Sequence, residues 1–167
     1  MLGNHDACQI VGCQPRDFWD SLNSKQKEYY AKELAKLPLA ASIGNVIALH
    51  GALPNVKSLG EIDKIVDADD NWMRIMWGDF AELEGGEFGE DRHGRPRFGR
   101  AYFNDIMKNL GMNMLIRSHQ SRSQMEIYDK KCLTIFTSSA YPVRRRVAIA
   151  DFKKNIKSVD DLIIEEI

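Results

Sequence analysis

The sequence predicts a layered α/β fold, because helical spacing dominates its first half and short apolar strands dominate its second half. The 167 residues suffice for one domain with a substantial core and are too few for two ordinary domains. No internal repeat or low-complexity tract divides the chain. We therefore expect residues 1–167 to belong to a single domain.

Helical patterns occupy three stretches of the chain. Residues 16–37 predict a helix in one or two pieces, with Ser24 as its N-cap. Residues 59–77 predict a second helix that is broken around residues 67–70. A third helical face ends at Gly111, a residue type that favours helix ends. The apolar members of that face are Phe103, Ile106, Met107 and Leu110.

Short apolar runs separated by polar turns predict the strands. Residues 40–49 contain two such runs around Gly44-Asn45, which is typical of a hairpin, and the second run leads into His50. Residues 112–116 predict a buried strand that ends shortly before His119. Further strands are predicted over residues 124–128, 132–137, 146–152 and 162–164.

Charge and composition exclude several classes of protein. The net charge of -1, from 23 Lys+Arg and 24 Asp+Glu, argues against nucleic acid or a membrane surface as a partner. No apolar run is long enough for a transmembrane helix, and the first residues do not form a signal peptide. Cys8, Cys13 and Cys132 form no CxxC pair, and this sparse, odd set suits a reducing cytoplasm better than a disulfide framework. We expect a cytoplasmic protein in which Cys8 and Cys13 are structural residues and not metal ligands.

Three of the four histidines lie in short motifs that are typical of metal and phosphate sites. The amide oxygen of Asn4 can ligate a divalent ion, and His5 beside it can protonate a leaving-group oxygen. His50 and His119 each follow an apolar strand pattern. One such histidine is more often an ordinary core residue, but two of them with an Asn-His turn favour a shared site for Mn, Fe or Zn. The motifs are Gly3-Asn4-His5-Asp6, His50-Gly51-Ala52-Leu53 and Arg117-Ser118-His119-Gln120.

In their order and spacing these motifs resemble those of the phosphoprotein phosphatases, the Ser/Thr phosphatase branch of the calcineurin-like metallophosphoesterases. The resemblance runs from Gly3 to about Phe152. It implies a metallophosphoesterase fold, in which a β-sandwich core is flanked by helices. It also implies a binuclear centre of divalent metal ions, with Mn preferred and Fe or Zn as alternatives. The other matching segments are Leu37-Pro38-Leu39-Ala40-Ala41, Trp77-Gly78-Asp79, Phe98-Gly99 and Thr134-Ile135-Phe136-Thr137-Ser138-Ser139-Ala140-Tyr141.

The resemblance assigns a role to each candidate residue of the site. Asn4, His50 and His119 would hold the second metal of the centre. His5 would protonate the departing seryl or threonyl oxygen, and Tyr141 would line the same pocket. The implied reaction is attack on the phosphate by a hydroxide that bridges both metals.

A phosphate-binding arginine is expected within residues 82–97. This stretch is rich in Gly, Asp, Glu and Arg and has no apolar period, so it predicts a long surface loop. Arg92 lies seven residues before Gly99, which is the register of the family, and the resemblance assigns it to clamp phosphate oxygens. Arg95 and Arg97 lie on the same loop and are its rivals.

Two N-terminal motifs of the family, G-D-x-H-G and G-D-x-x-D-R-G, are not found in the chain. In the family they supply the ligands of the first metal, the bridging Asp, the Asp that orients the acid histidine and one phosphate-binding Arg. Gly78-Asp79 does not replace them, because Phe80-Ala81-Glu82 follows. We therefore expect residues 1–167 to be the C-terminal part of the domain without its N-terminal strands, with partial metal binding and weak activity. An exposed strand edge would then invite self-association.

Three functions follow from these observations as alternatives. The first is hydrolysis of a phosphorylated protein or peptide at Ser or Thr. The second is hydrolysis of small phosphoesters or dinucleoside polyphosphates, which Gly3-Asn4-His5-Asp6 alone does not distinguish from the first. The third is a non-catalytic interaction module, because three neutral ligands hold a divalent cation weakly without a bridging carboxylate. The motif around His119 and the segment that ends at Tyr141 favour the first function.

Overall fold

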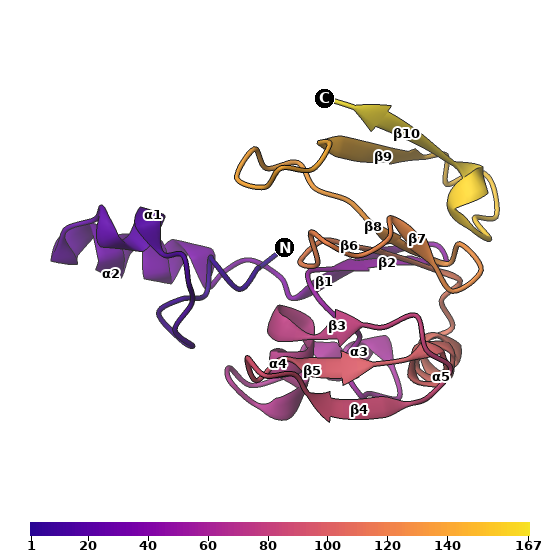
Figure 1. Cartoon of the computed structure of the whole chain (residues 1–167), viewed down its shortest axis with the longest axis horizontal. Coiled ribbons are helices and arrows are strands. Elements are labelled where there is room, and N and C mark those ends of the chain that lie inside the picture. Colours follow the sequence, from indigo (N-terminus) through magenta and orange to yellow (C-terminus); the bar gives the residue numbers. More distant parts are fainter.

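A five-stranded sheet lies at the centre of the molecule, and the computed structural model describes it together with all other parts of residues 1–167 (Figure 1). β2 (Val46–Leu49) pairs in parallel with β6 (Met114–Arg117), and β6 pairs in parallel with β8 (Cys132–Thr134). β1 (Ala40–Ile43) and β7 (Glu126–Ile127) pair antiparallel at the two edges. The combination of parallel strands with helices confirms the predicted α/β class.

The three inner strands are mostly apolar because both faces of the sheet are covered, and the polar exceptions, Arg117 and Thr134, end β6 and β8. The edge strand β1 differs, since three of its four residues are exposed. The predicted hairpin between β1 and β2 is confirmed. Gly44 adopts a left-handed conformation with φ of 58° in its turn, a conformation that glycine reaches without strain.

Helices cover one face of the central sheet. α4 (Asp70–Trp77) and α5 (Arg100–Leu110) contribute most of the large core on this side, and the short α3 (Leu59–Ile62) precedes them. The predicted break before Asp70 is confirmed, because Asp69 caps α4 by accepting a hydrogen bond from Trp72 N. Gly111 ends α5 in a left-handed conformation, as predicted.

A small sheet of three strands extends this layer, in the order β3-β5-β4. Its strands are β3 (Asp79–Phe80), β4 (Glu87–Glu90) and β5 (Pro96–Phe98). The prediction of a surface loop over residues 82–97 is therefore wrong, because β4 and β5 form an antiparallel hairpin. All four residues of β4 are exposed, so its sequence lacks the alternation of apolar and polar residues from which a strand is predicted.

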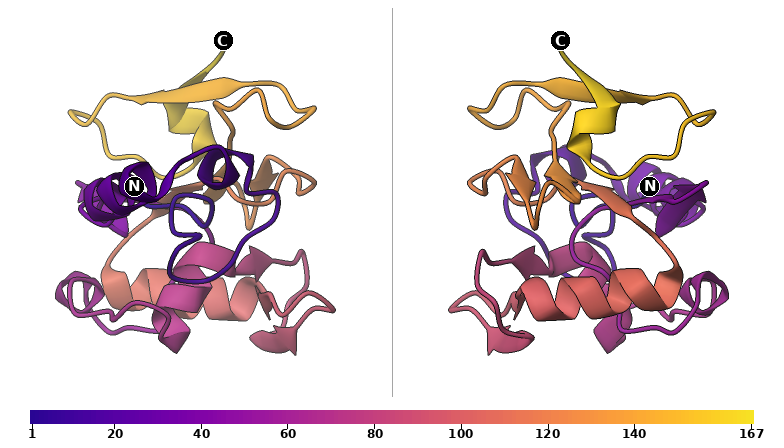
Figure 2. Two further views of the ribbon diagram at one scale, coloured as in Figure 1. Left: turned by 90° about the vertical axis from the view of Figure 1, so that its left-hand side faces the viewer. Right: turned by 90° about the vertical axis from the view of Figure 1, so that its right-hand side faces the viewer.

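A second, two-stranded sheet covers the opposite face of the central sheet. β9 (Arg146–Ala150) pairs antiparallel with β10 (Leu162–Glu166), which follows the short 3₁₀ helix η1 (Val159–Asp161). The side views show the resulting stack, with β9 and β10 above the central sheet and α5 below it (Figure 2). A separate apolar cluster fills the space between the two sheets, and its buried members are Val46, Met114, Leu133, Ile156 and Val159.

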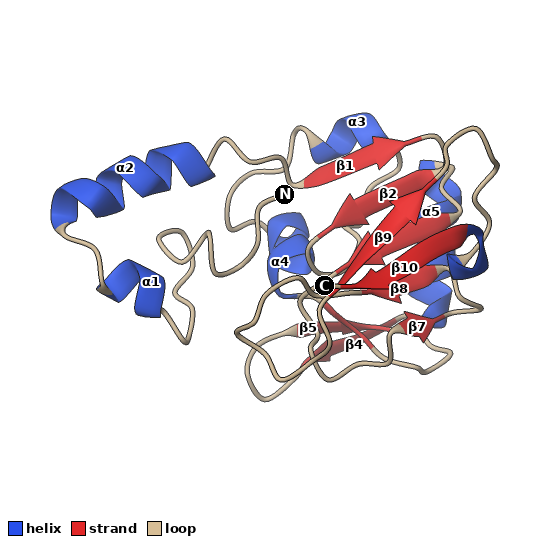
Figure 3. Cartoon of the chain, turned by 90° about the horizontal axis from the view of Figure 1, so that it is seen from above, coloured by secondary structure: helices blue, strands red, loops and turns tan.

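The N-terminal helices project to one side of this stack (Figures 1 and 3). α1 (Asp17–Asp20) and α2 (Ser24–Leu34) confirm the prediction of a helix in two pieces, and α2 buries none of its residues. The predicted N-cap is wrong by one residue. Asn23, not Ser24, caps α2, because its side chain accepts from Gln26 N while the Gln26 side chain accepts from Asn23 N.

A disulfide closes the coil that precedes α1. Cys8 and Cys13 are bonded, with their Cα atoms 5.1 Å apart, and both pack against the buried Trp19. The prediction that the chain holds no disulfide is therefore wrong for this pair, whereas Cys132 is a free, buried thiol. No helix is both long enough and apolar enough to cross a membrane.

Candidate metal centre and active site

Asn4, His50 and His119, which we call the strand-end site, meet at one edge of the central sheet. His50 follows β2 and His119 lies two residues beyond β6. Because these strands are parallel neighbours, their carboxyl ends lie at the same edge. His50 Nε2 lies 2.8 Å from Asn4 Oδ1 and 3.2 Å from His119 Nδ1. The structure thus brings the three predicted metal ligands together.

Two separations among these three atoms are compatible with ligands of one divalent ion. Bonds of about 2.1 Å at right angles place neighbouring ligand atoms about 3.0 Å apart. A tetrahedral ion with bonds of similar length would separate them by about 3.3 Å. The observed separations of 2.8 Å and 3.2 Å lie on either side of the octahedral value. One amide oxygen and two imidazole nitrogens are also a donor set that Mn, Fe and Zn accept.

The two histidines are held in the neutral form that binds metals. Burial, together with the positive charge of Arg117, lowers the pKa of His50 to about 3. Burial lowers the pKa of His119 to about 2, with smaller contributions from His50 and Arg117. Both rings therefore carry a free lone pair at neutral pH, so a cation does not have to displace a proton.

The backbone around the strand-end site is constrained at two points. His119 has a φ of 65°, a left-handed conformation that costs a non-glycine residue about 1 kcal/mol or more. Gly3 lies against the His50 ring, where a Cβ atom would approach Nδ1 and Cε1 to 3.0 Å. The glycine of the first motif is therefore required by the close approach of the chain to a metal ligand.

Asp79 lies behind His119 and was not assigned to the metal site from the sequence. Its Oδ1 atom is 3.5 Å from His119 Nε2, and both atoms are buried without a hydrogen-bond partner. Burial raises the pKa of Asp79, against the opposing charges of Arg117 and Arg95. A carboxylate behind a metal-binding histidine commonly fixes the tautomer of the ring and raises its basicity. The segment Trp77-Gly78-Asp79 was recognised as a match to the family, but its position in the sequence did not show that Asp79 lies close to His119.

His5 lies beside the strand-end site and is held by two hydrogen bonds. Its Nδ1 atom lies 3.0 Å from the carbonyl oxygen of Pro15, which can only accept, so Nδ1 carries the proton. Trp19 Nε1 donates to the His5 carbonyl at 2.7 Å and fixes the backbone. Nε2 is then the nitrogen available for proton transfer. The Pro15 carbonyl oxygen orients the ring, a role that the resemblance assigned to an aspartate.

A cleft of about 440 Å³ opens over these residues. Asn4, His5, His50, His119 and Tyr141 all line it, as the sequence predicted for a shared pocket. The Tyr141 ring packs edge-on against Phe136, with ring centres 5.4 Å apart. The cleft is therefore bounded by the predicted acid, the predicted ligands and one aromatic wall.

A second hollow, of about 530 Å³, shares His119 and Tyr141 with the cleft. Arg95 lines this hollow, with its guanidinium 3.7 Å from Asp79 and over the Trp77 ring at 5.8 Å. Arg92 lines neither hollow; it is exposed, and its Nε atom donates to His93 Nε2 at 3.0 Å. Of the three candidate arginines, Arg95 lines the second hollow, whereas Arg92 and Arg97, the latter within β5, lie outside both hollows.

The model of one protein family, described as calcineurin-like phosphoesterase, matches residues 1–122. The matched region includes Asn4, His5, His50 and His119. The chain belongs to the calcineurin-like phosphoesterases. Membership of this family confirms the resemblance drawn from the motifs. It also agrees with the grouping of candidate metal ligands at the ends of β2 and β6. Enzymes of this family use divalent metal ions in phosphoester hydrolysis.

The fold of this calcineurin-like phosphoesterase is similar to that of a protein serine/threonine phosphatase from Saccharomyces cerevisiae, which is described as similar to human phosphatase PP5. The TM-score is 0.71, the sequences are 22% identical, and the match covers 98% of this chain and 58% of the yeast chain. At this identity the match shows a shared fold. No curated protein matches the chain.

Proposed function

We propose that this calcineurin-like phosphoesterase hydrolyses phosphoserine or phosphothreonine in a protein or peptide. The observation that carries the proposal is the cleft in which an amide oxygen and two neutral imidazoles converge beside a histidine acid. The fold shared with a serine/threonine phosphatase supports the choice of substrate.

Each residue of the cleft has a defined task in the proposed reaction. Asn4, His50 and His119 would hold a divalent cation, which, when bound, polarises the phosphate and activates water. His5 acts as an imidazolium: it gives the Nε2 proton to the departing seryl or threonyl oxygen and keeps the Nδ1 proton in its hydrogen bond to Pro15. Arg95 binds phosphate oxygens through its planar guanidinium, in the role that the family resemblance assigns to Arg92.

The preferred cation in this proposal is Mn²⁺, with Fe and Zn as alternatives. The donor set of one amide oxygen and two imidazole nitrogens supports a first-row divalent ion of this kind. All three donors are neutral, and the carboxylate of Asp79 lies behind His119 and not among them. A site with so little negative charge binds a divalent cation weakly, so we propose partial occupancy and low activity for residues 1–167.

The substrate is tested by comparing turnover of a phosphoserine peptide and a dinucleoside tetraphosphate by the same Mn²⁺-supplemented chain. The proposal predicts a higher kcat/KM for the peptide. Preference for the dinucleoside polyphosphate would favour the small-molecule alternative. Turnover of neither substrate above that of His5→Gln would favour a non-catalytic interaction module.

We also propose self-association through the exposed edge of β1, where Ile43 leaves 54% of its surface in solvent. Light scattering over a range of concentrations tests this, and a mass that stays monomeric throughout would contradict it.

We also propose a cytoplasmic location for the protein. Cell fractionation tests it, and recovery of the protein with the membrane or secreted fraction would exclude it.

A further inference from the structure

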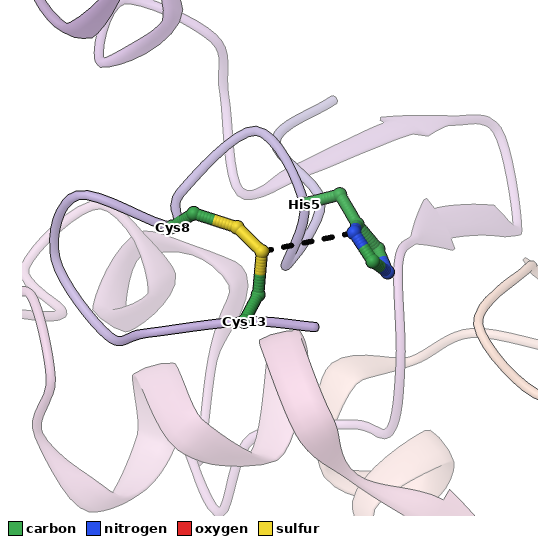
Figure 4. Close-up of side chains that lie close together, drawn as sticks. All are labelled: His5, Cys8 and Cys13. Carbon is green, nitrogen blue, oxygen red and sulfur yellow. Dashed lines mark hydrogen bonds between the residues drawn. A yellow bond between two sulfur atoms is a disulfide. The ribbon is translucent and has the colours of Figure 1, made fainter. Parts of the chain in front are cut away.

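A second group of metal-binding side chains lies in the N-terminal coil. His5, Cys8 and Cys13, which we call the coil site, place one ligand atom each within 4.8 Å of one another. Figure 4 shows Cys8 and Cys13 joined through their sulfur atoms, with the His5 ring beside the sulfur of Cys13. Cys8 and Cys13 are buried, with 5% and 4% of their surfaces exposed, and His5 is half-buried. The three residues are therefore shielded from solvent on one side and reachable from the cleft through His5.

We propose that, when Cys8 and Cys13 are reduced, the coil site binds one thiophilic divalent cation, with Zn²⁺ as the fitting ion. Two thiolates and one imidazole form a donor set that selects Zn²⁺ over Mn²⁺ or Mg²⁺. Zn–S and Zn–N bonds of about 2.3 Å and 2.0 Å at a tetrahedral angle place sulfur and nitrogen about 3.5 Å apart. The observed distance between Cys13 Sγ and His5 Nδ1 is 3.7 Å.

The surroundings of the coil site leave room for a fourth ligand. The Pro15 carbonyl oxygen lies 3.0 Å from His5 Nδ1 and 3.7 Å from Cys13 Sγ. This oxygen, or a water entering from the cleft beside His5, completes a tetrahedral set. Trp19 packs over both sulfurs from the other side and keeps bulk solvent away.

The disulfide and the bound cation exclude each other. A thiol or phosphine reductant supplies two electrons, the S–S bond breaks, and each sulfur takes one proton to give two thiols. When the cation binds, each thiol releases its proton and ligates as a thiolate. A small-molecule disulfide accepts two electrons from the two thiolates and leaves as two thiolates, the Cys8–Cys13 bond re-forms, and the cation is released. The redox state of Cys8 and Cys13 therefore decides whether the coil site can bind a cation.

Binding of a cation at the coil site would also change His5, which lines the cleft. His5 Nδ1 would exchange its N–H bond to Pro15 for a bond to the cation, and the one remaining ring proton would lie on Nε2. Loss of that proton would leave an imidazolate, so the metal-bound ring would be a much weaker acid than the imidazolium. This consequence rests on the proposed function, whereas the cation site itself does not. Reduced protein with Zn²⁺ would then be reversibly inhibited, and a chelator would restore activity.

The test uses Co²⁺ as a spectroscopic substitute for Zn²⁺ in the full chain. Metal-free protein is reduced with a phosphine and titrated with Co²⁺, because thiolate-to-cobalt charge transfer gives strong near-ultraviolet bands that N and O ligands do not give. We expect these bands to saturate at one Co²⁺ per chain and to disappear when Zn²⁺ is added. Oxidised protein should show no such bands, even if Co²⁺ enters the strand-end site.

Three variants complete the test. Cys8→Ser combined with Cys13→Ser should abolish the charge-transfer bands, while Cys132→Ala, which removes the thiol outside the coil site, should leave them unchanged. His5→Asn should weaken Co²⁺ binding by about tenfold or more, since even the loss of an outer partner of a metal ligand costs that much. Absence of the bands in reduced protein, or their persistence in the double serine variant, would overturn the proposal. If the double variant does not fold, the comparison of reduced with oxidised protein decides the matter alone.

Discussion

The strand-end site and the coil site lie next to each other but are built in different ways. His50 and His119 are attached to parallel strands whose residues are buried on both sides. His5, Cys8 and Cys13 lie on a coil whose shape depends on one disulfide and on packing against Trp19. The first arrangement is fixed by the core of the protein, and the second can change with the redox state of two sulfurs.

This difference separates two tasks within one cleft. A metal ligand must be held to within a fraction of an ångström, which rigid strands provide. A proton donor such as His5 needs a correct orientation, which two hydrogen bonds to Pro15 and Trp19 provide. Asn4 and His5 are adjacent in the chain, so the coil contributes to both tasks.

Replacement of the acid should produce the largest effect. His5→Gln should lower kcat on a phosphoserine peptide by about 10²–10⁴-fold, because the alkoxide would leave without a proton. On an aryl phosphate, whose leaving group needs no protonation, the loss should be much smaller. Steady-state kinetics on the two substrates measure the difference, with His93→Gln as the matched control. Equal losses on both substrates would show that His5 acts in another way.

The carboxylate behind the metal ligand should have the next largest effect. Asp79→Asn should weaken Mn²⁺ binding by about 10–100-fold, because His119 would lose the group that fixes its tautomer. Asp105→Asn, at an exposed position of α5, is the control. Titration of Mn²⁺ followed by calorimetry measures both. An unchanged Mn²⁺ affinity in Asp79→Asn would show that Asp79 does not support His119 as a metal ligand.

The pH dependence of stability should report the two buried imidazoles. The pKa values of His50 and His119 are lowered to about 3 and about 2, so between there and pH 6.5 the unfolded chain binds more protons than the folded chain. Stability should therefore fall as the pH falls below 6.5, by up to about 1.4 kcal/mol per pH unit for each histidine. Urea unfolding of metal-free protein at pH 7.0 to 4.5 measures this slope. A His50→Gln variant with the slope of the native chain would contradict it.

Substitution of the loop arginines should have the smallest effect and should separate Arg95 from Arg92. Arg95→Lys should raise KM for a phosphopeptide about tenfold, because an ammonium group cannot bind phosphate oxygens in a bidentate manner. Arg92→Lys should leave KM unchanged, since the residue lines neither hollow. The reverse result would restore the assignment made from the register to Gly99.

The sequence predicted the parts of the site that depend on regular structure. His50 and His119 follow apolar runs, and the ends of neighbouring parallel strands meet whatever the intervening loops do. The layers, the β1–β2 hairpin and the end of α5 at Gly111 follow from the same periodicities and turn signals.

The parts that depend on tertiary contacts were not predicted. Asp79 reaches His119 only because β3 lies next to the loop after β6, and no periodicity encodes that contact. Arg95 lines the hollow beside His119 because of how the turn between β4 and β5 packs, and a count of residues from Arg92 to Gly99 does not contain that information. Cys8 and Cys13 are bonded because the coil turns back on itself, which their spacing alone does not show.

The most direct test of the account is Mn²⁺ binding to metal-free protein, followed by electron paramagnetic resonance of the free ion. The account predicts that the native chain removes free Mn²⁺ signal to a limit of one ion or less per chain. His50→Ala should abolish this binding, while His93→Ala should leave it intact. Equal Mn²⁺ binding by the native chain and by His50→Ala would show that Asn4, His50 and His119 do not form a metal site.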